Sequence, residues 1–190
     1  MEKMLEIRWH GRGGQGAKTA ATLLADVALS EGKYSQGFPE YGPERMGAPM
    51  RGFTRISDTP IRVHCGIYHP GIIAVLDETL FEVVDILEGA SEDTKLVVNT
   101  PCSPAELRVK YNIKGYHVFT VEATLISIEE LGRDMPNTPM LGALAKIASA
   151  PKLDTLIKDL DKKFSHKFSR KVIDDNIRAV KRAYEEVKGE

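Results

Sequence analysis

Hydrophobic and polar residues follow two different periods at the beginning of this chain. Residues 5–10 alternate between apolar and polar side chains, which is typical of a half-buried strand. Apolar residues then recur at helical spacing from Ala20 to Ala28, and Gly32 follows as a plausible cap, so we expect a helix over about 16–30. A cluster of glycines separates the two patterns. The sequence therefore predicts a strand, a glycine-rich turn and a helix.

The same change of period recurs through the middle of the chain. Apolar runs predict further strands at 51–56, 61–67, 72–77, 95–100 and 117–123. Helical patterns lie between or after them, at 78–88, 104–111 and 124–132. Strands that alternate with helices favour a mostly parallel sheet with helices on both faces, which is a Rossmann-like α/β fold.

Strand patterns end near Asp134, and helical patterns follow. In the segment PNTPMLGALAKIA, Thr138 is a candidate N-cap with Pro139 at the first helical position. The last helix carries an apolar stripe that we expect to pack on the domain or on a partner, formed by Ile173, Ile177, Val180, Tyr184 and Val187. We therefore expect an α/β domain over 1–150 and a helical extension of the same domain over 151–190.

Charge and composition exclude several classes of protein. The 190 residues contain 26 Lys and Arg against 27 Asp and Glu, so no overall basic field attracts nucleic acid. No apolar run approaches the ~20 residues of a membrane span, and the chain begins without a signal-peptide pattern. We expect a cytoplasmic protein that binds neither nucleic acid nor membrane.

The sequence gives little sign of a metal site. Cys65 and Cys102 are far apart and neither belongs to a C-x-x-C pair, so no disulfide framework, iron–sulfur or zinc ligand set is expected. His64, Cys65 and His69 are close in sequence, but adjacent residues of a strand point to opposite faces. We therefore expect no metal to be bound by this chain.

Two charged features have more than one interpretation. The basic run at 162–171 is typical of a solvated connection between helices, and it would also suit an acidic partner. Asp77 ends an apolar strand at the edge where ligands of α/β proteins gather. It would serve there as a helix cap or as part of a site.

The glycine cluster lies in the segment WHGRGGQG, where Gly11, Gly13 and Gly16 match G-x-G-x-x-G. A helix N-terminus after such a turn offers free N–H groups to an anion. The dinucleotide fingerprint also needs an acidic residue at the end of a second strand, but the segment KYSQGFPEYG shows no clear strand. The order of residues excludes a Walker loop. Three interpretations stay open: a dinucleotide site, a structural turn, and a site built jointly with a partner chain.

A second unusual segment, GFPEYGPERMGAPMRGF, spans residues 37–53 and reads as a long loop. Loops of this length are usually functional or disordered, and the aromatic residues argue against disorder. We expect an interface or an active-site wall formed by Phe38, Glu40, Tyr41, Glu44, Met46 and Pro49.

Three segments in the same order carry a family resemblance: HGRGGQGAKTAATLLADVAL, FPEYGPERMGAPMR and PNTPMLGAL. With them the chain resembles the gamma subunit of pyruvate (2-oxoacid):ferredoxin oxidoreductases over nearly its whole length. The resemblance implies an α/β subunit that joins alpha, beta and delta subunits. It places thiamine diphosphate and Mg on alpha and beta, and [4Fe-4S] clusters largely on delta. The complex converts a 2-oxoacid, here expected to be pyruvate, coenzyme A and oxidised ferredoxin into acyl-coenzyme A, carbon dioxide and reduced ferredoxin.

We expect this subunit to supply no catalytic residue and to bind no cofactor alone, while contributing to assembly and to the boundary that receives coenzyme A. The expected boundary residues are Gly11, Gly13, Gly14, Gln15, Gly16, Lys18, Arg45 and Arg51, with Asn137 and Thr138 as a possible second loop. In the structural alternative, the glycines serve backbone packing and the two arginines pair with Glu40 and Glu44. A stand-alone nucleotide-binding oxidoreductase and a purely structural interaction subunit are the other functions considered.

Overall fold

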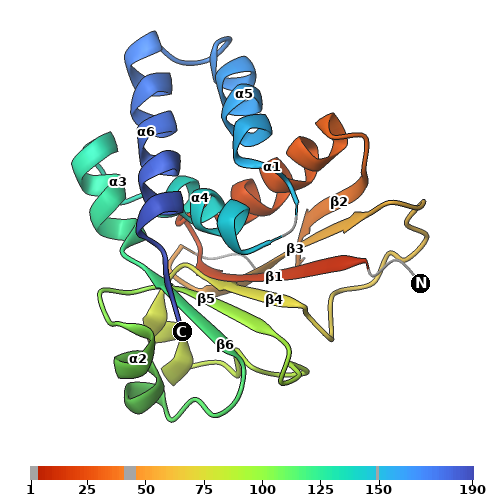
Figure 1. Ribbon diagram of the computed structural model, residues 1–190, viewed down its shortest axis with the longest axis vertical. Coiled ribbons are helices and arrows are strands. Elements are labelled where there is room, and N and C mark those ends of the chain that lie inside the picture. The colour runs from red at the N-terminus through yellow and green to blue at the C-terminus, as the bar shows by residue number, and fades with distance from the viewer. Residues whose placement is uncertain (1–3, 41–45, 149) are drawn as a thin grey trace.

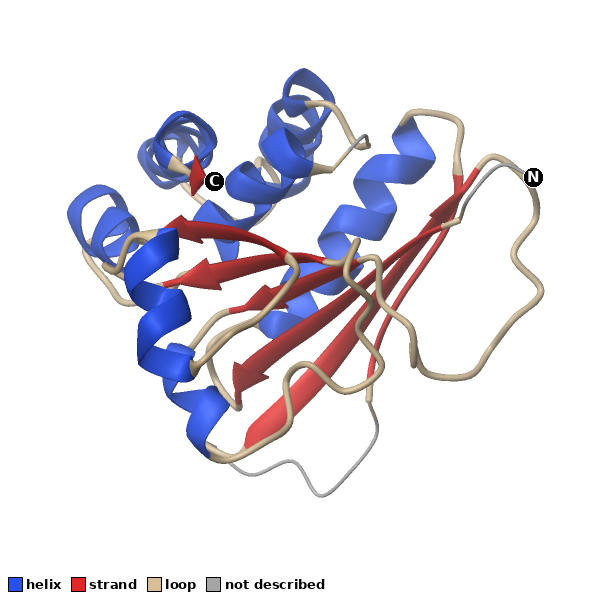
Figure 2. Cartoon of the chain, turned by 60° about the horizontal axis from the view of Figure 1, so that its bottom comes forward, coloured by secondary structure: helices blue, strands red, loops and turns tan. Residues whose placement is uncertain are grey.

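Four parallel strands form the centre of a seven-stranded mixed sheet in the computed structural model, which describes residues 4–40, 46–148 and 150–190. Figure 2 shows these strands as one twisted sheet. The strand order is β2-β3-β1-β4-β5-β6-β7, and β1, β4, β5 and β6 pair in parallel. Antiparallel pairs complete both edges. The strands are β1 Leu5–Arg12, β2 Tyr34–Pro39, β3 Pro49–Ser57, β4 Ile72–Val75, β5 Lys95–Asn99, β6 His117–Val121 and β7 Lys188–Gly189.

Helices cover both faces of this sheet, and the larger layer lies on one face (Figure 1). It contains α1 Ala17–Ser30, α3 Ala123–Leu131, α4 Asn137–Ile147, α5 Leu153–Phe164 and α6 Arg170–Glu186. The other face carries the 3₁₀ helix η1 Glu78–Glu82 and α2 Pro104–Tyr111. Among the described residues, no helix is long and apolar enough to cross a membrane.

Alternation along the strands divides the core in two. Ile7 and Trp9 of β1 point into the larger helical layer, where α1, α4, α5 and α6 bury their apolar faces in one cluster. Ile73 and Val75 of β4 point the other way, into a second cluster with α2 and η1. The central strands are apolar on both faces because both faces are covered. The predicted α/β fold with helices on both faces is confirmed.

The segment around Gly37 is a strand, so the predicted loop over 37–53 is too long. β2 pairs with β3 as an antiparallel hairpin, and only residues 40–48 connect the two strands. At Gly37 a Cβ atom would lie 2.7 Å from the carbonyl oxygen of Ala21, so only glycine allows β2 to lie this close to α1. A glycine and a proline in this strand hid it from pattern analysis.

The predicted strand over 61–67 is wrong, because these residues form an extended connection without a ladder. Its carbonyl groups are bound instead by two buried arginines. Arg55 Nη2 donates to the carbonyl oxygen of Gly66 at 3.0 Å, and Arg8 Nη1 donates to that of Ile67 at 3.5 Å. His64 and Cys65 therefore do not alternate on a strand as we had expected.

Two helix predictions also need correction. The helix expected over 78–88 is limited to η1, and the Asp85 carboxylate accepts from the backbone N–H of Leu87, which starts a separate turn. Helix α4 begins at Asn137 with Pro136 at the cap position, so Thr138 is a helical residue and not the N-cap. Asn137 and Thr138 are buried in the first turn of α4 and do not form a loop.

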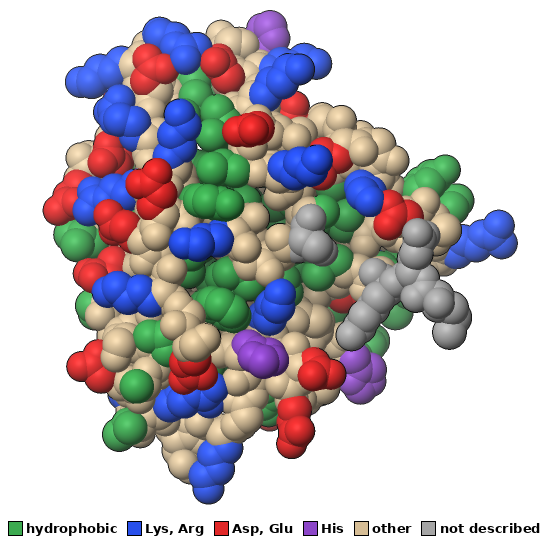
Figure 3. All heavy atoms as spheres, viewed as in Figure 1, with side chains coloured by type: hydrophobic (Ala, Val, Ile, Leu, Met, Phe, Trp, Pro, Cys, Tyr) green, Lys and Arg blue, Asp and Glu red, His purple; other side chains and the backbone are tan. Residues whose placement is uncertain are grey.

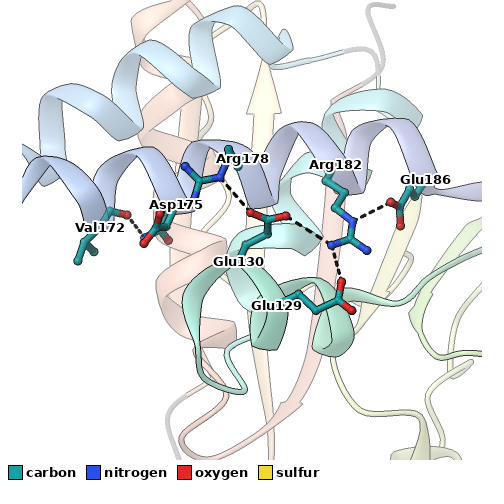
Figure 4. A network of polar contacts seen from close by, with 8 residues as sticks. Glu129, Glu130, Val172, Asp175, Arg178, Arg182 and Glu186 are labelled. Carbon is teal, nitrogen blue, oxygen red and sulfur yellow. Dashed lines mark hydrogen bonds and ion pairs between the residues drawn. The ribbon is translucent and has the colours of Figure 1, made fainter.

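The predicted helices over 16–30, 104–111 and 124–132 are confirmed to within one residue at each end, as α1, α2 and α3. The apolar stripe of the last helix also packs as expected, because Ile173 and Val180 are buried. Polar contacts hold α6 to α3: Arg182 bonds Glu129 and Glu130, and Arg178 bonds Glu130 (Figure 4).

Candidate functional site

The direction of the chain connections changes between β1 and β4. After β1 the chain passes through α1 to β2 and β3 on one side, while β4 and β5 lie on the other. Ligands of open α/β sheets bind outside the carboxyl ends of the strands at such a switch point. Arg12 ends β1 and Asp77 follows β4, so both residues lie at this edge.

A compact polar cluster fills the switch point. Arg12 Nε and Gln15 Nε2 each donate to Asp77 Oδ2 at 3.0 Å. Arg12 Nη2 also donates to Thr79 Oγ1 at 2.8 Å. The backbone N–H and the hydroxyl group of Thr79 each donate a hydrogen bond to Asp77 Oδ1. The cluster ties the glycine turn to the start of η1.

Asp77 is ionised within this cluster. Burial alone would raise the pKa of its carboxyl group, but hydrogen bonds from Thr79 and Gln15 and the charge of Arg12 outweigh burial and lower the pKa. Asp77 is also the N-cap of η1, because its side chain accepts from the backbone N–H of Thr79. Of the two roles open for Asp77, helix capping is therefore confirmed.

The glycines of the turn have separate structural reasons. A Cβ atom at Gly11 would lie 3.1 Å from the Cβ of Ala17, which reflects close packing of strand and helix. Gly16 has φ +81°, and a Cβ atom there would lie 2.6 Å from Asn137 Nδ2. Gly14 has φ +101° and nothing within 4 Å, so only backbone conformation requires glycine there. Close packing therefore explains Gly11 and Gly16, and an exposed turn explains Gly14.

The turn is joined to the connection between β2 and β3. Gly13 donates its N–H to the carbonyl oxygen of Ala48 at 2.9 Å, and Gly47 donates to that of Gly13 at 3.0 Å. Arg12 Nη1 donates to the carbonyl oxygen of Gly47 at 3.2 Å. Two segments that the sequence singled out separately therefore form one surface at the switch point.

Helix α1 begins at this surface without a side-chain cap. The N–H groups of its first turn have no partner within the helix, and the helix dipole adds a partial positive charge. Gln15 makes no cap bond, since its oxygen accepts from the backbone N–H of Arg12 at 2.8 Å and its nitrogen donates to Asp77. The surface therefore offers donors to an anion.

Arg51 lies on β3 opposite His10 of β1, and its guanidinium is engaged. It forms a two-point ion pair with Glu40 at 2.6 and 2.7 Å and a longer contact to Glu88 at 3.5 Å. The hydrogen bonds that Arg51 donates to Glu40 are the largest cause of the raised pKa of Arg51. The Arg51–Glu40 pair is the one that the structural alternative anticipates.

The remaining residues of the expected interface loop differ in exposure. Phe38 is half-buried on β2, with its ring 5.3 Å from the ring of Phe53 and the guanidinium of Arg55 over it. The side chain of Met46 is 95% exposed, and Pro49 is also exposed. Tyr41, Glu44 and Arg45 lie outside the described residues.

His10 adds a neutral donor that the sequence analysis missed. Arg8 Nε donates to His10 Nε2 at 3.1 Å, so the neutral ring carries its proton on Nδ1. Burial, with the charges of Arg8 and Arg51, lowers the pKa of His10 to about 3. The ring lines a cavity of about 350 Å³ together with Arg51 and Glu40.

Lys18 and Asn137 face a different cavity. Both line a groove of about 730 Å³ between α1, α4 and the helices α5 and α6. Lys18 and Arg51 therefore do not converge on one pocket within this chain. Asn137 is only 6% exposed, and its Oδ1 atom has no hydrogen-bond partner in the described part of the chain.

Arg8, His10 and Arg12 were absent from the predicted site because their positions on a strand read simply as polar alternation. The backbone carbonyl groups that Arg8 binds are 59 to 80 residues away in the sequence, and Asp77 is 65 residues from Arg12. The one available signal was two cationic residues and a histidine on the same face of β1, at alternate positions from Arg8 to Arg12.

Comparison with known proteins identifies the family. The family model described as pyruvate ferredoxin/flavodoxin oxidoreductase matches residues 6–186. The chain belongs to this family. It is 50% identical over 187 residues to pyruvate synthase subunit PorC of Thermotoga maritima, with 98% of this chain and 96% of the relative covered. It is 45% identical over 185 residues to the pyruvate/ketoisovalerate oxidoreductases common subunit gamma of Pyrococcus abyssi, with 96% of each covered.

Two solved structures of oxidoreductases have the same fold. The crystal structure of subunit PORC from Thermotoga maritima superposes with a TM-score of 0.87 at 46% identity and covers 99% of both chains. A 2-oxoglutarate:ferredoxin oxidoreductase from Magnetococcus marinus matches with a TM-score of 0.73 at 19% identity, over 96% of this chain and 31% of its own. The chain is thus a gamma-type subunit of a multi-subunit 2-oxoacid oxidoreductase.

Proposed function

We propose that this gamma-type subunit works with alpha, beta and delta subunits to convert pyruvate, coenzyme A and oxidised ferredoxin into acetyl-coenzyme A, carbon dioxide and reduced ferredoxin. Its resemblance to the gamma subunits and the names of its relatives support this assignment. The chain has two cysteines, so it cannot supply the four thiolates of a [4Fe-4S] cluster by itself. Thiamine diphosphate, Mg and the clusters are assigned to partner subunits, and ferredoxin reaches the complex through them.

Within this complex, the surface around the glycine turn contributes to the boundary that receives coenzyme A. The observation that carries this proposal is the uncapped N-terminus of α1, which lies at the switch point of the sheet. A phosphate group accepts hydrogen bonds from free backbone N–H groups at a helix N-terminus. The Magnetococcus marinus enzyme is described with coenzyme A and succinyl-coenzyme A bound, which supports coenzyme A as a co-substrate of this class.

The polar cluster has a positioning role in this proposal. Arg12 and Gln15 hold Asp77 and the turn in one arrangement, so the N–H groups of the turn need not reorganise when an anion arrives. Arg51 provides a guanidinium that matches phosphate in two-point geometry, once its ion pair with Glu40 is exchanged. The net free energy of this contact is therefore that of pairing Arg51 with phosphate minus that of pairing it with the Glu40 carboxylate.

The choice of 2-oxoacid is assigned to the other subunits. A Pyrococcus abyssi relative is named as a common subunit of pyruvate and ketoisovalerate oxidoreductases, so that gamma subunit serves two substrates. In the present chain the candidate surface is built from glycine backbone and charged side chains. Such groups suit the phosphates of coenzyme A, which would be common to reactions of different 2-oxoacids.

Two substitutions at the Arg51–Glu40 pair test the coenzyme A proposal in opposite directions. Arg51→Ala in the assembled enzyme removes the guanidinium and should raise the KM for coenzyme A about tenfold, whereas Glu40→Gln releases it and should lower that KM. The KM for pyruvate should remain nearly unchanged in both variants. Lys181→Ala serves as the control, because Lys181 is exposed on α6 and lines neither the Arg51 cavity nor the glycine turn.

If both substitutions leave the KM for coenzyme A at its original value in an intact complex, the pair is structural and the proposal is wrong. A parallel change in the KM values for coenzyme A and pyruvate would indicate a general distortion of the complex. That result would also contradict a specific contact with coenzyme A.

A further inference from the structure

We propose that the groove between α1, α4 and the α5–α6 hairpin receives a segment of a partner subunit that presents apolar side chains flanked by carboxylates. The groove has a volume of about 730 Å³. It lies on the larger helical layer, and its site is separate from the Arg51 cavity. The proposal uses the chain's membership of a multi-subunit complex and does not depend on the contact with coenzyme A.

The floor of the groove is apolar and open to solvent. It is formed by Leu23, Leu131, Phe164, Phe168 and Val172. Phe168 is 44% exposed in the connection between α5 and α6, and it packs edge-on against Phe164 at 5.2 Å. Covering such a surface removes apolar area from water, which favours association.

The rim of the groove is basic, and three of its cationic or titratable side chains lack an acidic partner within the described residues. Arg133, His166 and Lys167 have no carboxylate partner among the described residues, while Lys163 pairs with Asp26. Lys and Arg side chains gather around the end where α5 and α6 are connected (Figure 3). The opposite edge of α6 differs, because Arg178 and Arg182 are both paired with glutamates of α3 (Figure 4). The unpaired rim therefore fits carboxylates from another chain.

A buried amide at the base of the groove also lacks a partner. Asn137 lines the groove, and its Oδ1 atom accepts no hydrogen bond in the described part of the chain. Buried polar groups are nearly always satisfied in native proteins, by protein or by ordered water.

The charge of the rim argues against a second copy of this chain as the occupant. A twofold contact through the groove would bring Arg133 and Lys167 of one copy against the same basic residues of the other. Like charges across an interface are unfavourable, whereas an acidic segment complements them. A partner subunit is therefore the occupant that the chemistry favours.

Site-specific crosslinking in the co-expressed complex tests the occupant directly. A photoreactive phenylalanine analogue at position 168 should crosslink to a partner-subunit peptide that contains apolar residues next to Asp or Glu. The same analogue at position 109 is the control, because Val109 is 85% exposed on α2, in the other helical layer. Crosslinks at position 168 only within this chain, to a second copy, or to no protein would overturn the proposal.

Charge reversal tests the basic rim independently. The double variant Arg133→Glu with Lys167→Glu should reduce the amount of this subunit recovered with a tagged partner by about fivefold at physiological salt. Lys181→Glu is the matched control, since Lys181 is exposed on α6 and does not line the groove. Equal recovery of the double variant and the control would contradict the proposal. Thermal unfolding of the isolated variants verifies that each is folded.

Discussion

Arg12 Nε donates a hydrogen bond of 3.0 Å to Asp77 Oδ2, and this ion pair joins the carboxyl ends of β1 and β4. The position is the one where many α/β proteins bind a nucleotide. Here the protein's own side chains occupy it and hold the glycine turn against the start of η1. A surface that is fixed in this way suits a boundary site completed by other subunits.

Removal of the Asp77 carboxylate should weaken this arrangement. Asp77→Ala deletes the cap of η1 and leaves Arg12 and Gln15 without their shared acceptor, so the free energy of unfolding should fall by about 2 kcal/mol. Urea denaturation of the isolated chain measures the change. Asp93→Ala is the control, because Asp93 is exposed and should change stability by less than about 0.5 kcal/mol. Equal losses would show that the cluster does not stabilise the fold.

Two glycines of the turn should differ in their tolerance of alanine. Gly14→Ala meets open space and should cost only about 1 kcal/mol for its positive φ, whereas Gly16→Ala also meets Asn137 and should cost about 3 kcal/mol. Combining Gly16→Ala with Asn137→Ala should recover about 1 kcal/mol relative to the sum of the single variants. Strict additivity would contradict the steric account.

The buried His10 predicts a loss of stability in acid. Its folded-state pKa of about 3 lies below the usual histidine value, so the unfolded chain binds the proton more tightly and stability falls as pH drops from about 7 toward 3. At pH 5 this loss of stability amounts to about 2 kcal/mol, given an unfolded-state pKa of about 6.5. His10→Gln cannot be protonated and should lose about 2 kcal/mol less than the original protein between pH 7.5 and pH 5. Parallel pH profiles would refute this assignment.

The surface ion pairs between α3 and α6 should matter less. Arg182 bonds Glu129, Glu130 and Glu186 (Figure 4), but the glutamates are partly open to solvent. Arg182→Ala should therefore reduce the free energy of unfolding by about 1 kcal/mol or less, and added salt should shrink the difference. A loss above about 3 kcal/mol would show that the network is a major determinant of helix packing.

The spacing of apolar residues along the chain was enough to predict those elements in which the apolar residues are the buried ones. β1 and α1 follow this rule, because their apolar residues alternate or recur on one face. The strand β2 was missed since Gly37 serves contact with α1, which is a tertiary requirement. The false strand over 61–67 has suitable residues, but buried Arg8 and Arg55 bind its carbonyl groups, and local sequence gives no sign of that.

The site was predictable only in part for the same reason. The glycine turn and the loop after Gly37 were recognised separately, but their backbone pairing through Gly13 and Ala48 depends on the sheet. The ion pair of Arg12 with Asp77 joins residues 65 apart in the sequence. Nor did the sequence reveal that Lys18 and Arg51 line different cavities, because this depends on how the two layers of the fold are placed.

Hydrogen exchange in the assembled complex tests the central claim most directly. If the glycine turn belongs to the coenzyme A boundary, saturating coenzyme A should slow exchange at the N–H groups of Gly14, Gly16 and Ala17 about tenfold or more, while α2 remains unchanged. Identical exchange at these three groups with and without coenzyme A, in a complex that still turns over, would contradict the claim.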